Sequence, residues 1–408
     1  MSISNKKLLV VLGMHRSGTS VVTRGLQVLG VNLGGTLYSA TEGVNDKGFW
    51  EDIDLHSLDV EMLAALGSDW HHLFPISHRD VGVLRNKGYF LRAVELLRQK
   101  MSTEHVFGFK DPRMAKLLPF WKEVFSYCQF DVTYILTVRH PTSVVKSLAK
   151  RDSFDTEKSY LLWLGHIITS MVDSADGKRV LVDYDRLMRS PENELTRIAK
   201  ATELEINPAE LQNYKSEFLD QKLRHTVYDL NDLSLDNACP PLAREIYAEL
   251  LDVASDKIQI EDIALQRKVE LWAGEFDRLK SALVLIDKLY TQTAERDEQI
   301  ACLNQDIANI NQALAERDAH IQRLTSSKSW LITKPLRWVD EILLGDLSAA
   351  IDSIKRTLHL NKPIANLPTA SFNEHQNTDS NTDPITALPI DPSENRFDRE
   401  SITQGKHV

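Results

Sequence analysis

Apolar runs alternate with amphipathic stretches along the first part of the chain, residues 1–255. Short continuous runs of Leu, Val and Ile predict buried strands, and apolar residues three or four positions apart predict helices. Strands are predicted at Lys6–Leu12, His105–Phe109, Val132–Val138 and Arg179–Asp183. Helices are predicted at Thr19–Leu29, Met114–Tyr127, Thr142–Lys150, Lys158–Ser174 and Pro191–Thr202. This alternation predicts an α/β domain, a parallel sheet flanked by helices, over residues 1–255.

A heptad pattern follows this domain, and it predicts a long coiled-coil helix at residues 262–325. Its stripe consists of Leu279, Ala282, Ile286, Leu289, Ile300, Leu303, Ile307, Ile310, Leu314, Ile321 and Leu324. The segment Ala-Glu-Arg-Asp at 294–297 recurs at 315–318, three heptads later, which favours a homo-oligomer through the coiled coil. Arg296 and Arg317 interrupt the stripe. A single long helix packed on its own domain stays open as the alternative.

Two further segments follow the heptad pattern. Residues 326–360 combine Trp330 and Trp338 with Lys328, Lys334 and Arg337. This amphipathic, basic and aromatic composition fits either a peripheral membrane contact or a cap on the coiled coil. Residues 361–408 are rich in Asn, Thr, Asp and Pro, and we predict that they form a disordered tail.

The charge and the cysteine content exclude several classes of protein. The chain has 48 Lys and Arg residues against 58 Asp and Glu residues, a net charge of −10, so we expect no nucleic-acid partner. Cys128, Cys239 and Cys302 are too few and too far apart for a disulfide framework or a thiolate metal site. The apolar run near the N-terminus is too short for a secretory signal. We therefore expect a cytoplasmic protein, with peripheral contact at the inner face of the membrane as an open alternative.

The residues between the first strand and the first helix form a phosphate-binding pattern, Gly13 to Ser20. Its glycines let backbone NH groups and the positive end of the helix converge on an anion, and Ser17, Thr19 and Ser20 add hydroxyl donors. The spacing of the glycines also fits a nucleoside-triphosphatase P-loop. That loop requires Lys after the second glycine, where this chain has Thr19, and the cation here is Arg16. A P-loop kinase or nucleotide hydrolase is therefore the alternative function.

Two ordered motifs carry a resemblance to a known family. Arg16-Ser17-Gly18-Thr19-Ser20 after the first strand resembles the 5′-phosphosulfate loop of sulfotransferases that use 3′-phosphoadenosine 5′-phosphosulfate (PAPS). The strand at Val132–Val138, followed by Arg139 and, eight positions later, Ser147, is similar to the family's 3′-phosphate motif. Arg139 leaves the strand tip, and Ser147 lies about two helical turns further on, on the side facing that tip.

Weaker elements of the resemblance follow in the same order. Lys110-Asp111-Pro112-Arg113 looks like the family's central strand end, and Val182-Asp183-Tyr184-Asp185 like a later segment. The resemblance spans about Lys6 to Leu204, and the segment 223–225 resembles a further loop over the nucleotide. It implies a sulfotransferase that takes PAPS as sulfuryl donor and needs no metal. The donor-binding residues that it implies are His15, Arg16, Ser17, Gly18, Thr19, Ser20, Arg139, Ser147 and Arg224.

The catalytic residues that follow from this resemblance are Arg16 and Lys110, which would stabilise the leaving phosphate and the transferring group. Cytosolic members of the family have a His as base where this chain has Pro112, so another group must take the proton. The candidates are Glu51 and Asp111, with Asp52 and His56 behind them. Glu51 follows Phe49 and Trp50; the alternative is that it is a solvated surface acid.

The acceptor is less defined by the sequence. The segment Ser327 to Trp338 is similar to tails on bacterial enzymes that build surface glycans, which implies a carbohydrate hydroxyl as acceptor. An inactive sulfotransferase-like scaffold that acts through its coiled coil is the third hypothesis.

Overall fold

The computed structural model describes residues 6–40, 47–219, 228–343, 351 and 354. The chain divides into two compact units, residues 1–305 and residues 306–408. The predicted tail at 361–408 and the candidate donor ligand Arg224 lie outside the described residues.

A four-stranded parallel sheet forms the centre of the first unit. The strands are β1 (Lys7–Leu12), β2 (Val106–Lys110), β3 (Asp131–Val138) and β4 (Lys178–Asp183), in the order β2-β1-β3-β4. In the register, Lys7 of β1 is paired with Val106 of β2 and with Asp131 of β3. The predicted α/β class with a parallel sheet is confirmed, and each of the four predicted strands is present.

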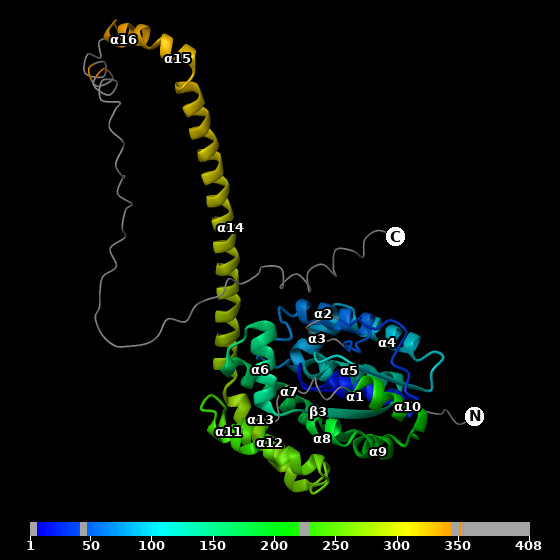
Figure 1. Ribbon diagram of the computed structural model, residues 1–408. Coiled ribbons are helices and arrows are strands. Elements are labelled where there is room, and N and C mark those ends of the chain that lie inside the picture. The colour runs from blue at the N-terminus through cyan, green and yellow to red at the C-terminus, as the bar shows by residue number, and fades with distance from the viewer. Residues whose placement is uncertain (1–5, 41–46, 220–227, 344–350, 352–353, 355–408) are drawn as a thin grey trace. The chain divides into compact units, whose positions relative to one another are not determined.

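Helices cover both faces of this sheet, because successive residues of a strand point to opposite sides. Leu8, Val10 and Leu12 of β1 belong to one apolar core, and Leu9 and Val11 belong to the other. Figure 1 shows α2, α4 and α5 on one side of the sheet and α9 on the other. The helices of this unit are α1 (Thr19–Leu26), η1 (Gln27–Leu29), α2 (Ile53–Ala65), α3 (His78–Asn86), α4 (Tyr89–Lys100), α5 (Met114–Cys128), α6 (Pro141–Asp152), α7 (Thr156–Asp173), α8 (Tyr184–Arg189), α9 (Pro191–Thr202), α10 (Pro208–Asn213), η2 (Tyr214–Phe218), α11 (Leu230–Leu235), α12 (Pro241–Ala254) and α13 (Ile263–Arg278).

The helices between residues 53 and 100 were not predicted from the sequence. In α2 the apolar positions share the buried side with Asp59, which is fully buried, so the binary pattern is blurred. The Asp52 carboxylate begins this helix by accepting hydrogen bonds from the backbone NH groups of Asp54 and Leu55.

The packed domain extends beyond residue 255, where the sequence pattern predicted its end, because helix α13 packs on it. Helix α13 buries Leu265, Val269, Trp272 and Phe276 in the same core as the sheet. Their spacing of four, three and four residues is also that of a heptad stripe, so the pattern alone cannot tell which surface covers them. The long helix α14 (Lys280–Thr325) starts only after this packing helix.

Helix α14 is followed by α15 (Lys328–Ile332) and α16 (Lys334–Leu343). In α15 and α16 the Arg337 guanidinium lies 3.8 Å from the centre of the Trp330 ring. Among the described residues, no helix is both long enough and apolar enough to cross a membrane.

Candidate active site

The loop between β1 and α1 includes Arg16 and Gly18, which both have positive φ angles. Gly18 is the N-cap of α1 with φ of 85°, in the left-handed region. A Cβ at this position would lie 2.1 Å from Cδ2 of Tyr184, so any side chain there would collide with that ring. Arg16 also has a positive φ, 67°, which is uncommon for a residue other than glycine. Ser17 and Thr19 are buried beside them.

The two donor motifs of the sequence lie side by side, because β1 and β3 are neighbours in the sheet. Nη1 of Arg139 donates to the carbonyl oxygen of Arg16 over 3.0 Å. Nε of Arg16 donates to Oγ of Ser147 over 2.7 Å. Arg139 lies 123 positions after Arg16 in the sequence, and Ser147 lies 131 positions after it. The fold joins all three at the carboxyl edge of the sheet, where ligands of open α/β sheets bind. The structure brings these residues together; their roles toward the donor stay predictions.

Positive charge accumulates around Arg16. Burial, together with the charges of Arg151 and Arg139, lowers the pKa of the Arg16 guanidinium to about 10. The Arg139 guanidinium packs 4.5 Å from the centre of the Tyr184 ring, and Arg151 is paired with Asp152. Cations that destabilise one another in this way attract an anion, because a bound anion removes the repulsion.

Glu51 and Lys110 form a buried ion pair next to the phosphate loop. Nζ of Lys110 lies 2.5 Å from Oε1 of Glu51, and the two residues are 3% and 7% exposed. The same Nζ lies 3.4 Å from Oγ of Ser20, whose hydroxyl donates to the carbonyl of Phe49. The alternative that Glu51 is a solvated surface acid is therefore wrong. Trp50, directly before Glu51, has φ of 58°, a strained value for a bulky residue.

Asp111, His56 and Arg113 form a second cluster beside this pair. Oδ1 of Asp111 accepts hydrogen bonds from the backbone NH of Arg113 over 2.8 Å and from its Nη1 over 3.4 Å. The same Nη1 lies 3.1 Å from Nε2 of His56, which lies 3.9 Å from Oε2 of Glu51. Asp52, by contrast, caps α2 and pairs with Lys100 at 2.8 Å.

This cluster includes a set of groups that could ligate a metal ion. Ligand atoms of Glu51, His56 and Asp111 lie within 4.8 Å of one another. Lys110 and Arg113 already pair with the two carboxylates, and an added divalent cation would face the repulsion of both. The arrangement therefore suits proton and anion handling better than metal binding.

His15 packs against Trp70 with 4.2 Å between the ring centres. Burial and the charge of Arg151 hold the pKa of His15 well below its ordinary value, so that its ring is neutral. Sequence reasoning missed Trp70, because no motif connects its loop with the phosphate loop. The proximity of Arg151 to Arg16 could have been predicted from the sequence, because Arg151 follows Ser147 by four residues and lies on the same side of α6.

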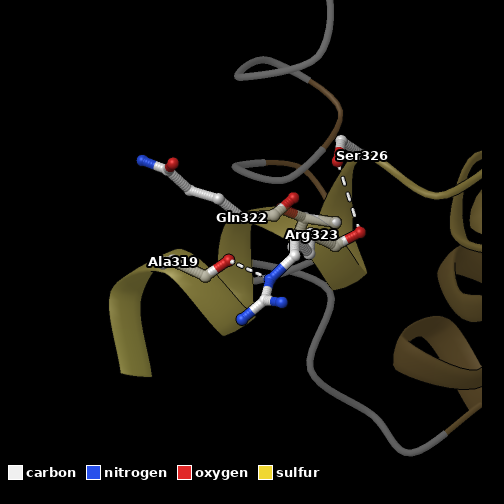
Figure 2. Close-up of a pocket in the computed structure, with 5 residues that line it drawn as sticks. Ala319, Gln322, Arg323 and Ser326 are labelled. Atoms are coloured by element: carbon white, nitrogen blue, oxygen red, sulfur yellow. Dashed lines mark hydrogen bonds between the residues drawn. The ribbon is translucent and has the colours of Figure 1, made fainter. Parts of the chain in front are cut away.

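A separate hollow of about 620 Å³ lies at the end of α14, in the second unit. Figure 2 shows Ala319, Gln322, Arg323 and Ser326 around it. Nε of Arg323 donates to the carbonyl of Ala319, and the hydroxyl of Ser326 donates to the carbonyl of Arg323. These bonds belong to the helix and its end, and the described residues that line the hollow include no acid–base pair, so we do not regard it as a catalytic site.

The parallel α/β domain, with a glycine-containing cationic loop between β1 and α1, has a P-loop-like fold. Residues 9–208 match the family model described as the sulfotransferase family, and over this stretch the chain belongs to that family. The predicted family is confirmed.

Solved structures with a related shape are distant in sequence. The sulfotransferase domain from the Synechococcus PCC 7002 olefin synthase is 17% identical with a TM-score of 0.36, covering 62% of this chain and 96% of that one. The sulfotransferase domain from the curacin biosynthetic pathway is 13% identical with a TM-score of 0.33, covering 61% and 96%. Retinol dehydratase in complex with androsterone and inactive cofactor PAP is 13% identical with a TM-score of 0.28, covering 68% and 81%. None of the curated proteins matches the chain.

Proposed function

We propose that this protein transfers a sulfuryl group from PAPS to a hydroxyl acceptor. The observation that carries the proposal is the junction of the two cationic motifs, in which Arg139 bonds the backbone of Arg16 and Arg16 bonds Ser147. PAPS carries a phosphosulfate at one end of its nucleoside and a phosphate at the other. Two adjacent anion sites beside a buried acid–base pair meet that requirement.

The donor would be held from both ends by this chain. The NH groups of the loop and the start of α1 would bind the 5′-phosphosulfate, together with the Arg16 cation. Arg139 and the Ser147 hydroxyl would bind the 3′-phosphate, for which charge-assisted hydrogen bonds are suited. Arg16 and Ser147 bond to each other, so both side chains lie within reach of one bound phosphate group.

Transfer then needs one bond exchange and one proton acceptor. The acceptor oxygen attacks sulfur as the bond between sulfur and the bridging phosphate oxygen breaks, and the electron pair leaves with the phosphate. The hydroxyl proton passes to the Glu51 carboxylate. Lys110, which pairs with Glu51, would turn to the leaving phosphate and free that carboxylate.

Glu51 is a better base than Asp111, the other carboxylate suggested by the sequence. Asp111 is 1% exposed, and one of its oxygens is already bonded by the backbone and side chain of Arg113. We assign Asp111 the role of orienting Arg113, which in turn contacts His56.

The acceptor that we propose is a carbohydrate hydroxyl, in the synthesis of a bacterial surface glycan. Support comes from the likeness of residues 327–338 to tails on enzymes that build such glycans. Such an enzyme would work in the cytoplasm, where Trp330 and the neighbouring basic residues could bring it to the inner face of the membrane.

Ligand-dependent melting tests the donor class. Adenosine 3′,5′-bisphosphate should raise the melting temperature, since a ligand at 100 times its Kd adds about 2.7 kcal/mol to stability. At the same ligand concentration, Arg139→Ala should strongly reduce this shift, whereas Arg79→Ala, at an exposed position of α3, should preserve it. Stabilisation by ATP with magnesium alone would instead favour a kinase.

Transfer of labelled sulfate from PAPS to a panel of glycans tests the reaction itself. Labelled product that disappears in the Arg16→Ala variant supports the proposal. Bisphosphate binding without any transfer would favour the inactive scaffold.

A further inference from the structure

A stripe of apolar side chains runs exposed along α14. Each of its members has about half of its surface open to solvent, from 48% for Leu314 and Leu324 to 60% for Leu303. No residue of the helix from Thr291 to Thr325 is buried. The stripe consists of Leu289, Ile300, Leu303, Ile307, Ile310, Leu314, Ile321 and Leu324. A lone helix with such a stripe lacks the packing from which helices in proteins gain most of their stability.

The beginning of α14 packs differently, and this defines where the stripe becomes available. Leu283 is 1% exposed within the core of the first unit. The Asp287 carboxylate accepts hydrogen bonds from the backbone NH groups of Leu73 and Phe74, at 2.8–3.0 Å. The root of the helix is thus held by its own domain, and a partner can cover the stripe from Leu289 onward.

We propose that a second copy of this chain covers the stripe, forming a parallel two-stranded coiled coil in register. This proposal concerns residues 289–324 and is independent of the proposed enzymatic function. Ile occupies three of the four apolar a positions (Ile300, Ile307 and Ile321, with Leu314 as the fourth). Leu occupies three of the four apolar d positions (Leu289, Leu303 and Leu324, with Ile310 as the fourth). Ile at a with Leu at d is the combination that favours parallel pairs over trimers and tetramers.

The two charged residues that interrupt the stripe favour a second copy of the same chain as the partner. Arg296 and Arg317 occupy d positions, and each is followed by an aspartate at e, Asp297 and Asp318. In a parallel pair in register, a d side chain lies beside the e position of the other helix. The two Arg296 side chains share one layer of such a pair, as do the two Arg317 side chains, so each Arg must turn out of the seam toward the matching Asp of the second copy, at two layers 21 residues apart.

An antiparallel pair does not provide these partners. There, d positions lie opposite a positions, and every a position after Thr293 is apolar through Ile321. Arg296 or Arg317 would then be placed against an apolar layer, where an unpaired charge is strongly unfavourable. The Ala-Glu-Arg-Asp repeat thereby specifies direction and register at the same time.

The mass of the full chain in solution tests the pairing. Sedimentation equilibrium should give twice the chain mass of 46.3 kDa. Ile307→Asp introduces a charge at an a position and should weaken the dimer on the order of 100-fold in Kd. Ala308→Asp, its neighbour off the seam, adds the same charge to the same helix and should leave the dimer intact. A mass of one chain or of three chains for the wild type would overturn the proposal.

Cross-linking tests the direction and register. In a Cys302→Ser background, Ile321→Cys should give a covalent dimer under air oxidation, because like a positions meet in a parallel pair. The same helix position lies far from its counterpart in a fully overlapped antiparallel pair. A dimer by mass that does not cross-link at position 321 would refute the parallel register.

Discussion

The buried pair of Glu51 and Lys110 allows one substitution, Glu51→Gln, to be tested for two separate effects, on turnover and on the stability of the fold. Glu51→Gln retains the size of the side chain and its ability to accept a hydrogen bond, but it removes the charge and the proton acceptor. If Glu51 is the base, turnover at saturating donor should fall about 10²–10⁴-fold, the usual contribution of a positioned general base.

The same change should also destabilise the fold. Lys110 is 3% exposed, and its Nζ lies 2.5 Å from Glu51, so removal of the carboxylate leaves a buried ammonium without its counter-charge. Breaking such a pair costs about 3–5 kcal/mol of unfolding free energy. The double variant Glu51→Gln with Lys110→Met should recover much of that stability, because no charge stays buried, but it should not recover turnover.

Urea unfolding measures the loss of stability. Transfer of labelled sulfate to a hydroxyl acceptor that the wild type uses measures the loss of turnover. Glu61→Gln is the matched control, because Glu61 pairs with Arg92 at 2.7 Å on the surface, with about half of each side chain exposed. That control should change stability by less than about 1 kcal/mol and leave turnover unchanged. Turnover of Glu51→Gln within about threefold of the wild type would refute the assignment of the base.

Three further predictions follow from the site. Arg139→Ala should weaken binding of adenosine 3′,5′-bisphosphate about 10- to 100-fold by calorimetry, as expected for a lost charge-assisted hydrogen bond; unchanged affinity would contradict the 3′-phosphate role. Gly18→Ala should abolish bisphosphate binding, because its Cβ would lie 2.1 Å from the Tyr184 ring; retained affinity would show that the ring gives way. Burial raises the pKa of Asp183 to about 6, above its unfolded value of 3.8, so this carboxyl lowers stability progressively as pH rises from about 4 to 6. Asp183→Asn keeps the N-cap of α8 but cannot ionise. The unfolding free energy of this variant, relative to that of the wild type, should therefore rise by on the order of 2–3 kcal/mol between pH 4 and pH 7, as measured by urea unfolding. A constant difference in unfolding free energy across this range would contradict the raised pKa.

Local patterns were sufficient for the sheet and for the donor motifs. Buried parallel strands are short apolar runs between helices, and all four of them were recognisable, as was the loop at Gly13 to Ser20. The pairing of β1 with β3 could be anticipated because both donor motifs follow strand ends, where parallel strands present their carboxyl ends at one edge.

Contacts between side chains that are far apart in the sequence could not be predicted from local patterns. Glu51 and Lys110 are 59 residues apart, and which carboxylate reaches the lysine depends on the path of the chain before α2. Trp70 reaches His15 through a loop that has no periodicity. The same limit applied to α13, whose stripe packs on its own domain although its spacing is that of a coiled coil.

The sequence by itself determined the order of the elements, the sulfotransferase family and the positions of the two motifs at strand ends, because backbone preferences and short motifs act within a few residues. The tertiary structure alone decided that Glu51 is buried against Lys110, that Asp111 is bound by Arg113, and that α13 closes the domain. Those outcomes depend on which surfaces meet when the chain folds, and contacts between distant residues are set by packing and desolvation of the whole domain rather than by any local pattern.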